Sequence, residues 1–374
     1  KMKINNLFIN FVVAFMIGNC CFPSKYPVKG TFHFHNIETT VDSEIAKYYL
    51  EVYLSGHRTN QKFDELIDSI NLKYQNSMPN RDRLNLISKL TSVDFAAIYF
   101  ADTVLKESEN DDLQREFLSH LATVKLETIQ FPKKDYVILL VPGFDYVENG
   151  HITGADFAKP IALLRKTGFN VRLVAIDPIG SVEENAHFIA NFIKNEPSDK
   201  ILIAGASSAG PAIHLSLGNY LTNKETNRVR AWLNLGGILQ GVPVLDQFSK
   251  GIKGKFFDFI IWLKSWRKES FDSMRTEVSQ KRFESNKLAK HILVINYIGM
   301  SLSGNISKFA SDKYCLMRDD GPNDGLSLLP DLLAPDSMTI FAPKSDHFFA
   351  EDPEIDQKTV ALLKIILVKL EKGK

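Results

Sequence analysis

Continuous apolar runs of strand length alternate with helically periodic segments from residue 136 to the end of this 374-residue chain. The apolar runs are Tyr136–Val141, Val171–Ile176, Ile201–Ala204, Ala231–Leu235, Ile292–Ile298 and Met338–Phe341. The helical segments are Asp156–Lys166, Val182–Lys194, Ser208–Leu221 and Asp356–Lys372. Strands that are apolar on both faces need cover on both faces, as in a parallel sheet connected by helices. The pattern predicts an α/β fold whose functional groups lie at the carboxyl ends of the strands.

A different organisation is expected ahead of residue 133. Residues 22–40 contain Pro, Gly and His without a sustained period, which suggests a tether. His33 and His35 alternate across Phe34, but a metal site would need further ligands nearby, so we interpret the segment as extended and polar. Residues 41–132 show apolar positions at intervals of three and four, which predicts a small helical domain. Residues 133–374 then form the α/β domain.

The first 21 residues have the composition of a bacterial export signal. Lys1-Met2-Lys3 is followed by the apolar stretch from Leu7 to Ile17 and then by Gly18-Asn19-Cys20-Cys21. The segment ending at Cys20 resembles a lipoprotein cleavage box, although Asn19 departs from the small residue that is usual there. We therefore expect a lipidated Cys20 and a membrane-associated protein of the bacterial envelope, periplasm-facing or at the surface. Ordinary cleavage and an uncleaved anchor are the alternatives.

Charge and motif content exclude several classes of function. The net charge is +1 and the basic residues are dispersed, so nucleic-acid binding is not expected. Phosphate-binding glycine loops, C-x-x-C pairs and H-E-x-x-H motifs do not occur in the sequence, so we expect neither a nucleotide cofactor nor a metal. Cys315, away from the other two cysteines, is interpreted as a small buried apolar residue.

A turn of small residues follows the apolar run that ends at Ala204. The sequence there is Gly205-Ala206-Ser207-Ser208-Ala209-Gly210, and a helical segment begins directly afterwards. A serine on such a sharp strand-to-helix turn has its hydroxyl pushed above the sheet, which requires tiny neighbours two residues away on each side. Both Ser207 and Ser208 satisfy this rule. We prefer Ser207 as the nucleophile, and the alternative is that both serines only cap the helix.

Together with later residues, this turn resembles the α/β-hydrolase superfamily of serine esterases and lipases. The resemblance covers residues 135–374 and rests on the strand ending in Val141-Pro142-Gly143-Phe144, the serine turn, and an acid and a histidine in the order Ser, Asp, His. It implies that His347, in the loop after the last strand, is the base. It implies that Asp324 is the acid, because the segment Asn323-Asp324-Gly325-Leu326 is similar to several bacterial lipases. Asp319 and Asp320 lie close by as alternatives, and Asp346 is interpreted as a loop-shaping residue.

The resemblance also implies an oxyanion hole and an activity. Backbone N–H groups of Ser208 and Phe144 would stabilise the charge on an attacked carbonyl oxygen. The expected activity is hydrolysis of a carboxylic ester, small or lipid-like, through an acyl-enzyme. An acyltransferase or a thioesterase would use the same residues, and a non-catalytic binding protein on the same scaffold is the alternative from another class.

The segment 245–290 is longer than one crossover connection requires. It contains the apolar stretch Phe256–Trp266, flanked by Lys and Arg. By resemblance, an insertion at this place could form a lid suited to an acyl chain. The alternative is a helix packed against the helical domain.

Overall fold

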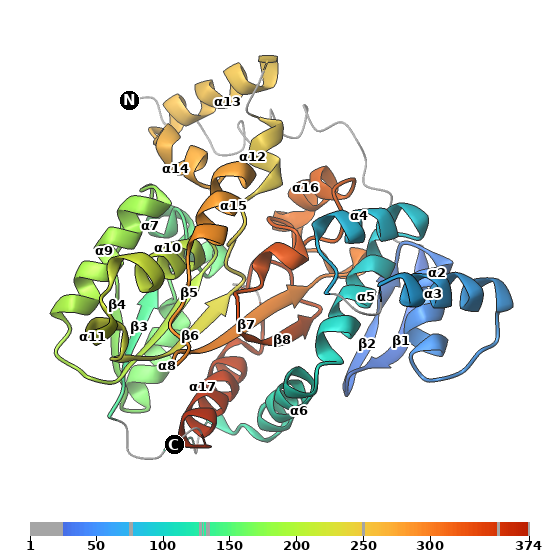
Figure 1. The fold of residues 1–374 in the computed structure, drawn as a ribbon, viewed down its shortest axis with the longest axis horizontal. Helices are drawn as coiled ribbons and strands as arrows, with labels where there is room; N and C mark the ends of the chain where they lie inside the picture. Colours follow the sequence, from blue (N-terminus) through green and yellow to red (C-terminus); the bar gives the residue numbers. More distant parts are fainter. Residues whose placement is uncertain are drawn as a thin grey trace.

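The computed structural model describes residues 25–74, 78–126, 129, 131, 135–248, 251–349 and 352–372. Its centre is a parallel sheet of six strands in the order β4-β3-β5-β6-β7-β8 (Figure 1). The strands are β3 (Val137–Val141), β4 (Asn170–Leu173), β5 (Ile201–Ala206), β6 (Val229–Leu235), β7 (Leu293–Met300) and β8 (Met338–Pro343). Each one coincides with an apolar run in the sequence, so the predicted α/β fold is confirmed.

Both faces of the sheet are buried under helices, and successive residues of each strand point to opposite faces. On β3, Leu139 joins one apolar cluster while its neighbours Ile138 and Leu140 join another. The first cluster is covered by α9 (Val182–Asn195) and α10 (Ala209–Leu215), and we call this side the α9/α10 face. The second is covered by α6 (Ser108–Thr123), α8 (Ala158–Lys166) and α17 (Ile355–Lys372), and we call it the α8/α17 face.

Helix α9 begins at a capping motif that provides acceptors for its free backbone N–H groups. Ser181 and Glu184 form the reciprocal capping box at the start of α9. The predicted helix 208–221 is divided, since α10 ends at Leu215 and a π-helical turn spans Ser216–Tyr220. The remaining short helices of this half are α7 (Tyr146–Thr153), α11 (Asn223–Thr226) and α16 (Lys308–Met317).

The predicted tether is wrong for residues 26–41, which form a hairpin. Strands β1 (Tyr26–Phe32) and β2 (His35–Val41) pair antiparallel, and Phe32 and Ile37 are buried in the N-terminal core. The turn at His33 and Phe34 has φ values of 40° and 68°. Non-glycine residues rarely adopt this left-handed conformation, so the usual Gly or Asn signal of a hairpin is missing from the sequence. His33 contacts Asp102 at 3.1 Å and Asp111 at 3.0 Å, and these ion pairs hold the turn.

Helices follow the hairpin, as predicted for residues 41–132. They are α2 (Glu44–Tyr48), α3 (Gln61–Tyr74), α4 (Arg81–Leu90), α5 (Val93–Leu105) and α6, with a π-helical turn at Tyr49–Tyr53. Their core is continuous with the sheet, because Ile298, Met300 and Phe341 of β7 and β8 belong to the same apolar cluster. Figure 1 shows this region against the β8 side of the sheet.

Helix α6 also satisfies the edge strand of the sheet. The Gln114 side chain accepts a hydrogen bond from the Phe341 N–H at 3.0 Å and donates one to the Phe341 carbonyl at 3.1 Å. Asn110 accepts another from the Thr339 N–H at 2.8 Å. These buried amides replace a neighbouring strand, so the β8 edge presents fewer free backbone groups.

The expected insertion folds into four helices between β6 and β7. They are α12 (Pro243–Gln247), α13 (Gly251–Lys264), α14 (Lys268–Ser273) and α15 (Thr276–Ser285). Ile261, Phe271 and Met274 pack into the cluster on the α9/α10 face rather than into the N-terminal core. In Figure 1 the first three helices lie beyond the carboxyl ends of the strands.

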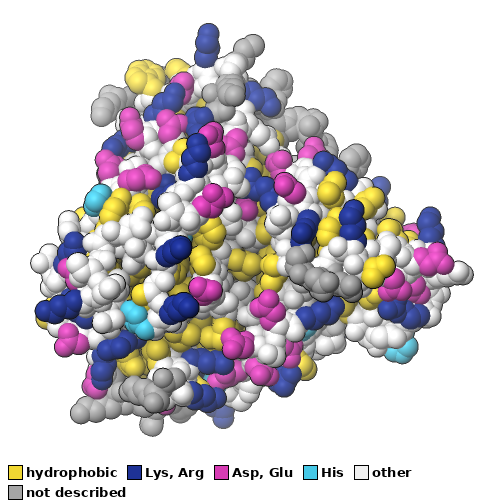
Figure 2. Space-filling model, in the orientation of Figure 1, with side chains coloured by type: hydrophobic (Ala, Val, Ile, Leu, Met, Phe, Trp, Pro, Cys, Tyr) yellow, Lys and Arg dark blue, Asp and Glu magenta, His cyan; other side chains and the backbone are white. Residues whose placement is uncertain are grey.

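Surface charge is mixed on the face shown in Figure 2, where basic and acidic side chains are interspersed. Among the described residues, no helix combines the length and the apolar character needed to cross a membrane. The predicted export signal and Cys20 lie outside the described residues.

Candidate active site

Ser207 occupies a left-handed turn between β5 and α10. Its φ is 54°, a conformation that a serine adopts only when its surroundings enforce it. The turn is fixed by hydrogen bonds from the Ser207 N–H to the Leu235 carbonyl and from the Ile238 N–H to the Ser207 carbonyl, both of 3.2 Å. A β-carbon on Gly205 would lie 2.3 Å from Ile213 Cδ1, and one on Gly210 would lie 2.6 Å from Gly237 Cα. The small residues identified in the sequence are therefore required by close packing.

His347 and Asp324 meet Ser207 from two later loops. His347 Nε2 lies 2.9 Å from Ser207 Oγ, and His347 Nδ1 lies 2.7 Å from Asp324 Oδ2. Both His347 and Asp324 are buried. The three residues predicted by the sequence are thus brought into one continuous chain of polar contacts.

The Asp324 loop is braced by its own backbone. Asp324 Oδ1 accepts hydrogen bonds from the N–H groups of Leu326 and Ser327, each of 2.9 Å. The Asp324 carbonyl accepts a further one from the His347 N–H at 2.8 Å. One carboxylate oxygen is therefore occupied by the loop, and the other is left facing the imidazole.

The alternative residues considered in the sequence lie elsewhere in the site. Within the described residues His347 contacts the hydroxyl of Ser207 and not that of Ser208, which is the residue before α10. Burial raises the pKa of Asp320, and neither Asp320 nor Asp319 contacts His347 in the described structure. Asp346 accepts hydrogen bonds from the N–H groups of Ser307 and Phe348, both of 2.8 Å, as expected of a loop-shaping residue.

The loop after β3 leaves one backbone donor unused beside the serine. Gly143 N–H donates to the Ala155 carbonyl at 3.2 Å, and Asp145 N–H donates to the Pro178 carbonyl at 2.7 Å. Between them, the Phe144 N–H has no acceptor among the described residues, and neither has the Ser208 N–H. A β-carbon on Gly143 would lie 3.4 Å from Ser207 Cβ, so this loop is packed against the turn that contains Ser207. Both predicted oxyanion donors therefore lie in segments adjoining Ser207.

The other histidines considered in the sequence, His214, His187 and His151, do not contact Ser207 or Asp324 in the described structure. His214 is buried against Trp232, and burial together with Arg282 lowers its pKa to about 4. His187 stacks on Tyr220 with ring centroids 3.9 Å apart. His151 lines the cavity beside Ser207 and is not part of the chain of contacts that joins Ser207, His347 and Asp324.

A cavity of about 840 Å³ opens at Ser207 and His347. Its roof is the insertion, which contributes mainly apolar side chains. They are Val244, Leu245, Phe248, Phe256, Phe257, Ile260 and Trp266. Phe144 packs edge to face on Trp266 and Phe271, with ring centroids 5.7 and 5.2 Å apart. The insertion is thus in direct contact with the loop that carries one of the unused donors.

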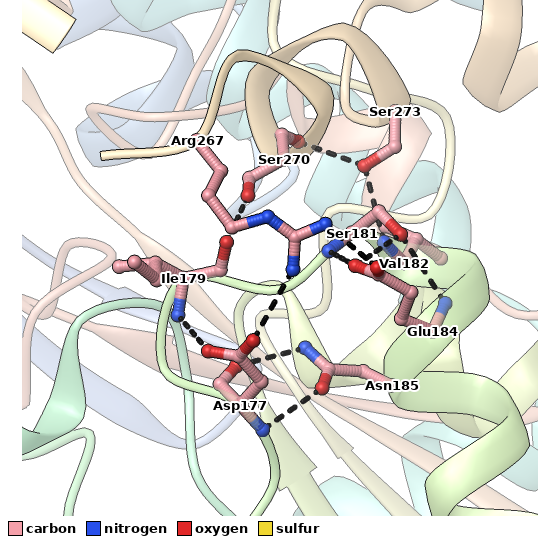
Figure 3. A network of polar contacts seen from close by, with 9 residues as sticks. All are labelled: Asp177, Ile179, Ser181, Val182, Glu184, Asn185, Arg267, Ser270 and Ser273. Carbon is pink, nitrogen blue, oxygen red and sulfur yellow. Dashed lines mark hydrogen bonds and ion pairs between the residues drawn. The ribbon is translucent and has the colours of Figure 1, made fainter. Parts of the chain in front are cut away.

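The insertion is fastened to the start of α9 by the network in Figure 3. Arg267 contacts Glu184 at 2.6 Å and Asp177 at 3.3 Å. Arg267 and the capping hydrogen bonds of Ser181 lower the pKa of Glu184 to about 2. The Val182 N–H donates to Ser273 Oγ at 3.1 Å, which gives α14 a second attachment. The second half of α13 has an exposed apolar surface, where Phe259 and Trp262 stack.

Metal-binding clusters of three or more His, Cys, Asp or Glu side chains are absent from the described part of the chain. Cys315 is disulfide-bonded and half-buried, so its interpretation as a small buried apolar residue was wrong. Cys315 lies almost three hundred residues after Cys21, and the sequence alone does not show which cysteines pair over such a separation.

No protein-family model and no curated protein sequence matches the chain. Solved structures do match it. A metagenomic carboxyl esterase superimposes with a TM-score of 0.53 at 16% identity, over 66% of this chain and 79% of that one. The chain has the α/β-hydrolase fold.

Two further solved structures also match the chain. The mature lipase BlEst2 of Bacillus licheniformis matches at 14% identity and a TM-score of 0.48, over 65% of this chain and 94% of that one. EstA from Clostridium botulinum matches at 11% identity and a TM-score of 0.46, over 68% and 97%. A carboxyl esterase and a lipase are among the structures that this chain resembles.

Sequence reasoning missed one part of this α/β-hydrolase site, the cavity wall formed by the sheet itself. Ala204, Ala206 and Ala231 lie on the α8/α17 face and line the cavity. Their small side chains, set among larger residues of the same strands, are the signal that could have revealed it.

Proposed function

We propose that this protein is a serine hydrolase that cleaves carboxylic esters through an acyl-enzyme. The observation that carries the proposal is the chain of contacts from Ser207 Oγ through the His347 ring to Asp324, at 2.9 and 2.7 Å. These are the distances at which a nucleophile, a general base and an orienting carboxylate operate. The esterases and lipases among the structural neighbours support the same class of reaction.

The proposed reaction begins with transfer of the Ser207 proton to His347 Nε2 as Ser207 Oγ attacks the ester carbonyl carbon. Asp324 holds the Nδ1–H of His347 and stabilises the imidazolium that forms. The N–H groups of Phe144 and Ser208 stabilise the oxyanion. His347 then returns the proton to the departing alcohol, and a water molecule, deprotonated by His347, releases the acid and restores Ser207.

Labelling with a fluorophosphonate probe tests the nucleophile. Wild-type protein and Ser208→Ala should be labelled, whereas Ser207→Ala should not, because Ser208 contributes only a backbone N–H. Labelling that is lost in Ser208→Ala instead would move the nucleophile by one residue. A wild-type protein that fails to label would favour a non-catalytic binding protein.

We also propose, from the sequence alone, that the protein is attached to the bacterial envelope through a lipidated Cys20. The triacylated cysteine of such lipoproteins would anchor firmly, whereas a single acyl chain binds membranes only marginally. Cys20→Ser should therefore shift the protein from the membrane to the soluble fraction. An unmodified mature N-terminus downstream of Cys21, found by mass spectrometry, would contradict this proposal and leave the hydrolase proposal intact.

A further inference from the structure

The α8/α17 face of the sheet contains open space that the other face does not. On β5 and β6, Ala204 retains 7% of its surface and Leu233 retains 9%, although both lie beneath helices. Their neighbours on the α9/α10 face, Ile203 and Trp232, retain 1% and 0%. Because consecutive residues of a strand lie at a similar depth in the molecule, we interpret this residual surface as that of a void beneath the helices, and both Ala204 and Leu233 line it.

This void is continuous with the cavity that opens at Ser207. Leu202, Ala204 and Ala206 line it in succession along β5, ending beside the serine turn. At roughly 3.3 Å for each residue of a strand, the distance from Leu202 to Ala206 is about 13 Å. The cavity therefore runs from Ser207 back along the strands, between the sheet and its covering helices.

The opposite wall of this channel is one face of α17. Thr359, Leu362, Leu363 and Ile366 line it, and their spacing of three, four and seven residues defines a single helical stripe. Leu164 of α8 adds another apolar contact. Lys364, the residue after Leu363, does not line the cavity. The channel is thus the space between one stripe of α17 and one face of the sheet.

Apolar side chains dominate the channel along the strands. Charge enters at the start of α17, where Lys358 is paired with Asp352 at 2.5 Å and with Glu354 at 3.6 Å. We therefore expect an occupant of the channel that is apolar and is attached at one end to a carbonyl group that reaches Ser207. A polar occupant would leave its polar atoms without partners.

We propose that the channel between the sheet and α17 binds the acyl chain of the substrate, so that the preferred esters carry a long acyl group. This inference rests on the proposed ester hydrolysis and adds to it the substrate class. The alcohol side of the ester would then lie under the insertion, on the other side of Ser207.

Chain-length profiles of channel variants test the inference. Leu363→Phe should narrow the channel, and Lys364→Phe, one residue along α17, is the matched control. With nitrophenyl esters from acetate to hexadecanoate, kcat/KM of the wild type should rise with acyl length. In Leu363→Phe the ratio of long-chain to short-chain kcat/KM should fall by about tenfold for every two methylene groups that no longer fit. Lys364→Phe should keep the wild-type profile.

Ala204→Leu, on the facing strand, provides a second obstruction should Leu363→Phe fail to fold. A profile that is flat in the wild type, or that falls by the same factor at every length in both obstructed variants, would overturn the inference while the hydrolase proposal stands.

A binding measurement separates the two proposals. Ser207→Ala should bind dodecanoic acid more tightly than hexanoic acid in calorimetric titration, and Ser207→Ala combined with Leu363→Phe should lose that difference. If no ester is cleaved by the wild type but this difference is found, ester hydrolysis is wrong and the channel is retained. If esters are cleaved and neither acid binds preferentially, the channel is wrong.

Discussion

The two faces of the central sheet are made from alternate residues of the same strands, but they are packed differently. On the α9/α10 face, Ile201 and Trp232 are fully buried in the cluster that includes α10, and neither lines the cavity. On the α8/α17 face, alanines replace larger residues at positions 204, 206 and 231, and a cavity remains. Well-packed interiors rarely contain voids larger than a water molecule. The difference agrees with the proposal that one face stabilises the fold while the other leaves room for an acyl chain.

The largest expected effect is on turnover and concerns the rim of the sheet, by which we mean the residues Ser207, His347 and Asp324 beyond the carboxyl ends of the strands. Asp324→Asn should lower kcat by roughly 10² to 10⁴-fold, because an amide fixes neither the productive tautomer nor the imidazolium of His347. Its denaturation midpoint should stay close to that of the wild type if the rim serves reaction and not folding. Steady-state kinetics and urea unfolding measure the two quantities.

Asp319→Asn and Asp320→Asn are the controls for that experiment. Neither side chain contacts His347 in the described structure, so both variants should be milder. If one of them matches His347→Ala in severity while Asp324→Asn stays active, the acid has been assigned to the wrong residue.

Truncation on the two faces of one strand should have unequal costs. Ile201→Ala opens a new void in a closed region, because Ile201 is fully buried and does not line the cavity, and it should cost about 4 kcal/mol of unfolding free energy. Leu202→Ala only enlarges an existing cavity, so its cost should be nearer to about 2 kcal/mol. Urea denaturation of both variants measures the difference. Equal losses would mean that the faces are equally well packed.

The smallest effect is expected from enlarging a side chain on each face. Ala212→Leu, in α10 on the closed face, should destabilise the protein by about 1–3 kcal/mol through overpacking. Ala204→Leu should cost little or raise stability, since the added methyl groups enter the cavity. A thermal melt distinguishes them, and a lower melting temperature for Ala204→Leu than for Ala212→Leu would contradict the comparison.

The same contrast explains which parts of the molecule were predictable. The strands, the α9 capping box and the Ser207 turn were visible because their signals are local in the sequence. Asp324 and His347 followed from chain order in the resembled superfamily, and the structure brings both to the serine. Ser207 was preferred over Ser208 although both fit the small-residue rule, and it is the Ser207 hydroxyl that contacts His347.

Other features depend on contacts between distant segments. The hairpin at 26–41 was missed because His33 and Phe34 form its turn in the left-handed conformation, which neither residue type favours. The channel was missed because its width depends on where α8 and α17 settle against the sheet, and no local pattern encodes that distance.

The left-handed backbone of Ser207 has a consequence for how this chain can change over time. An L-residue in that conformation carries roughly 1–2 kcal/mol of strain, which glycine would not. Ser207→Gly should therefore raise stability, whereas Ser207→Ala, which keeps a β-carbon, should leave the strain in place. Selection for stability alone would favour glycine at position 207, so the proposed nucleophile would be kept at a cost in folding free energy.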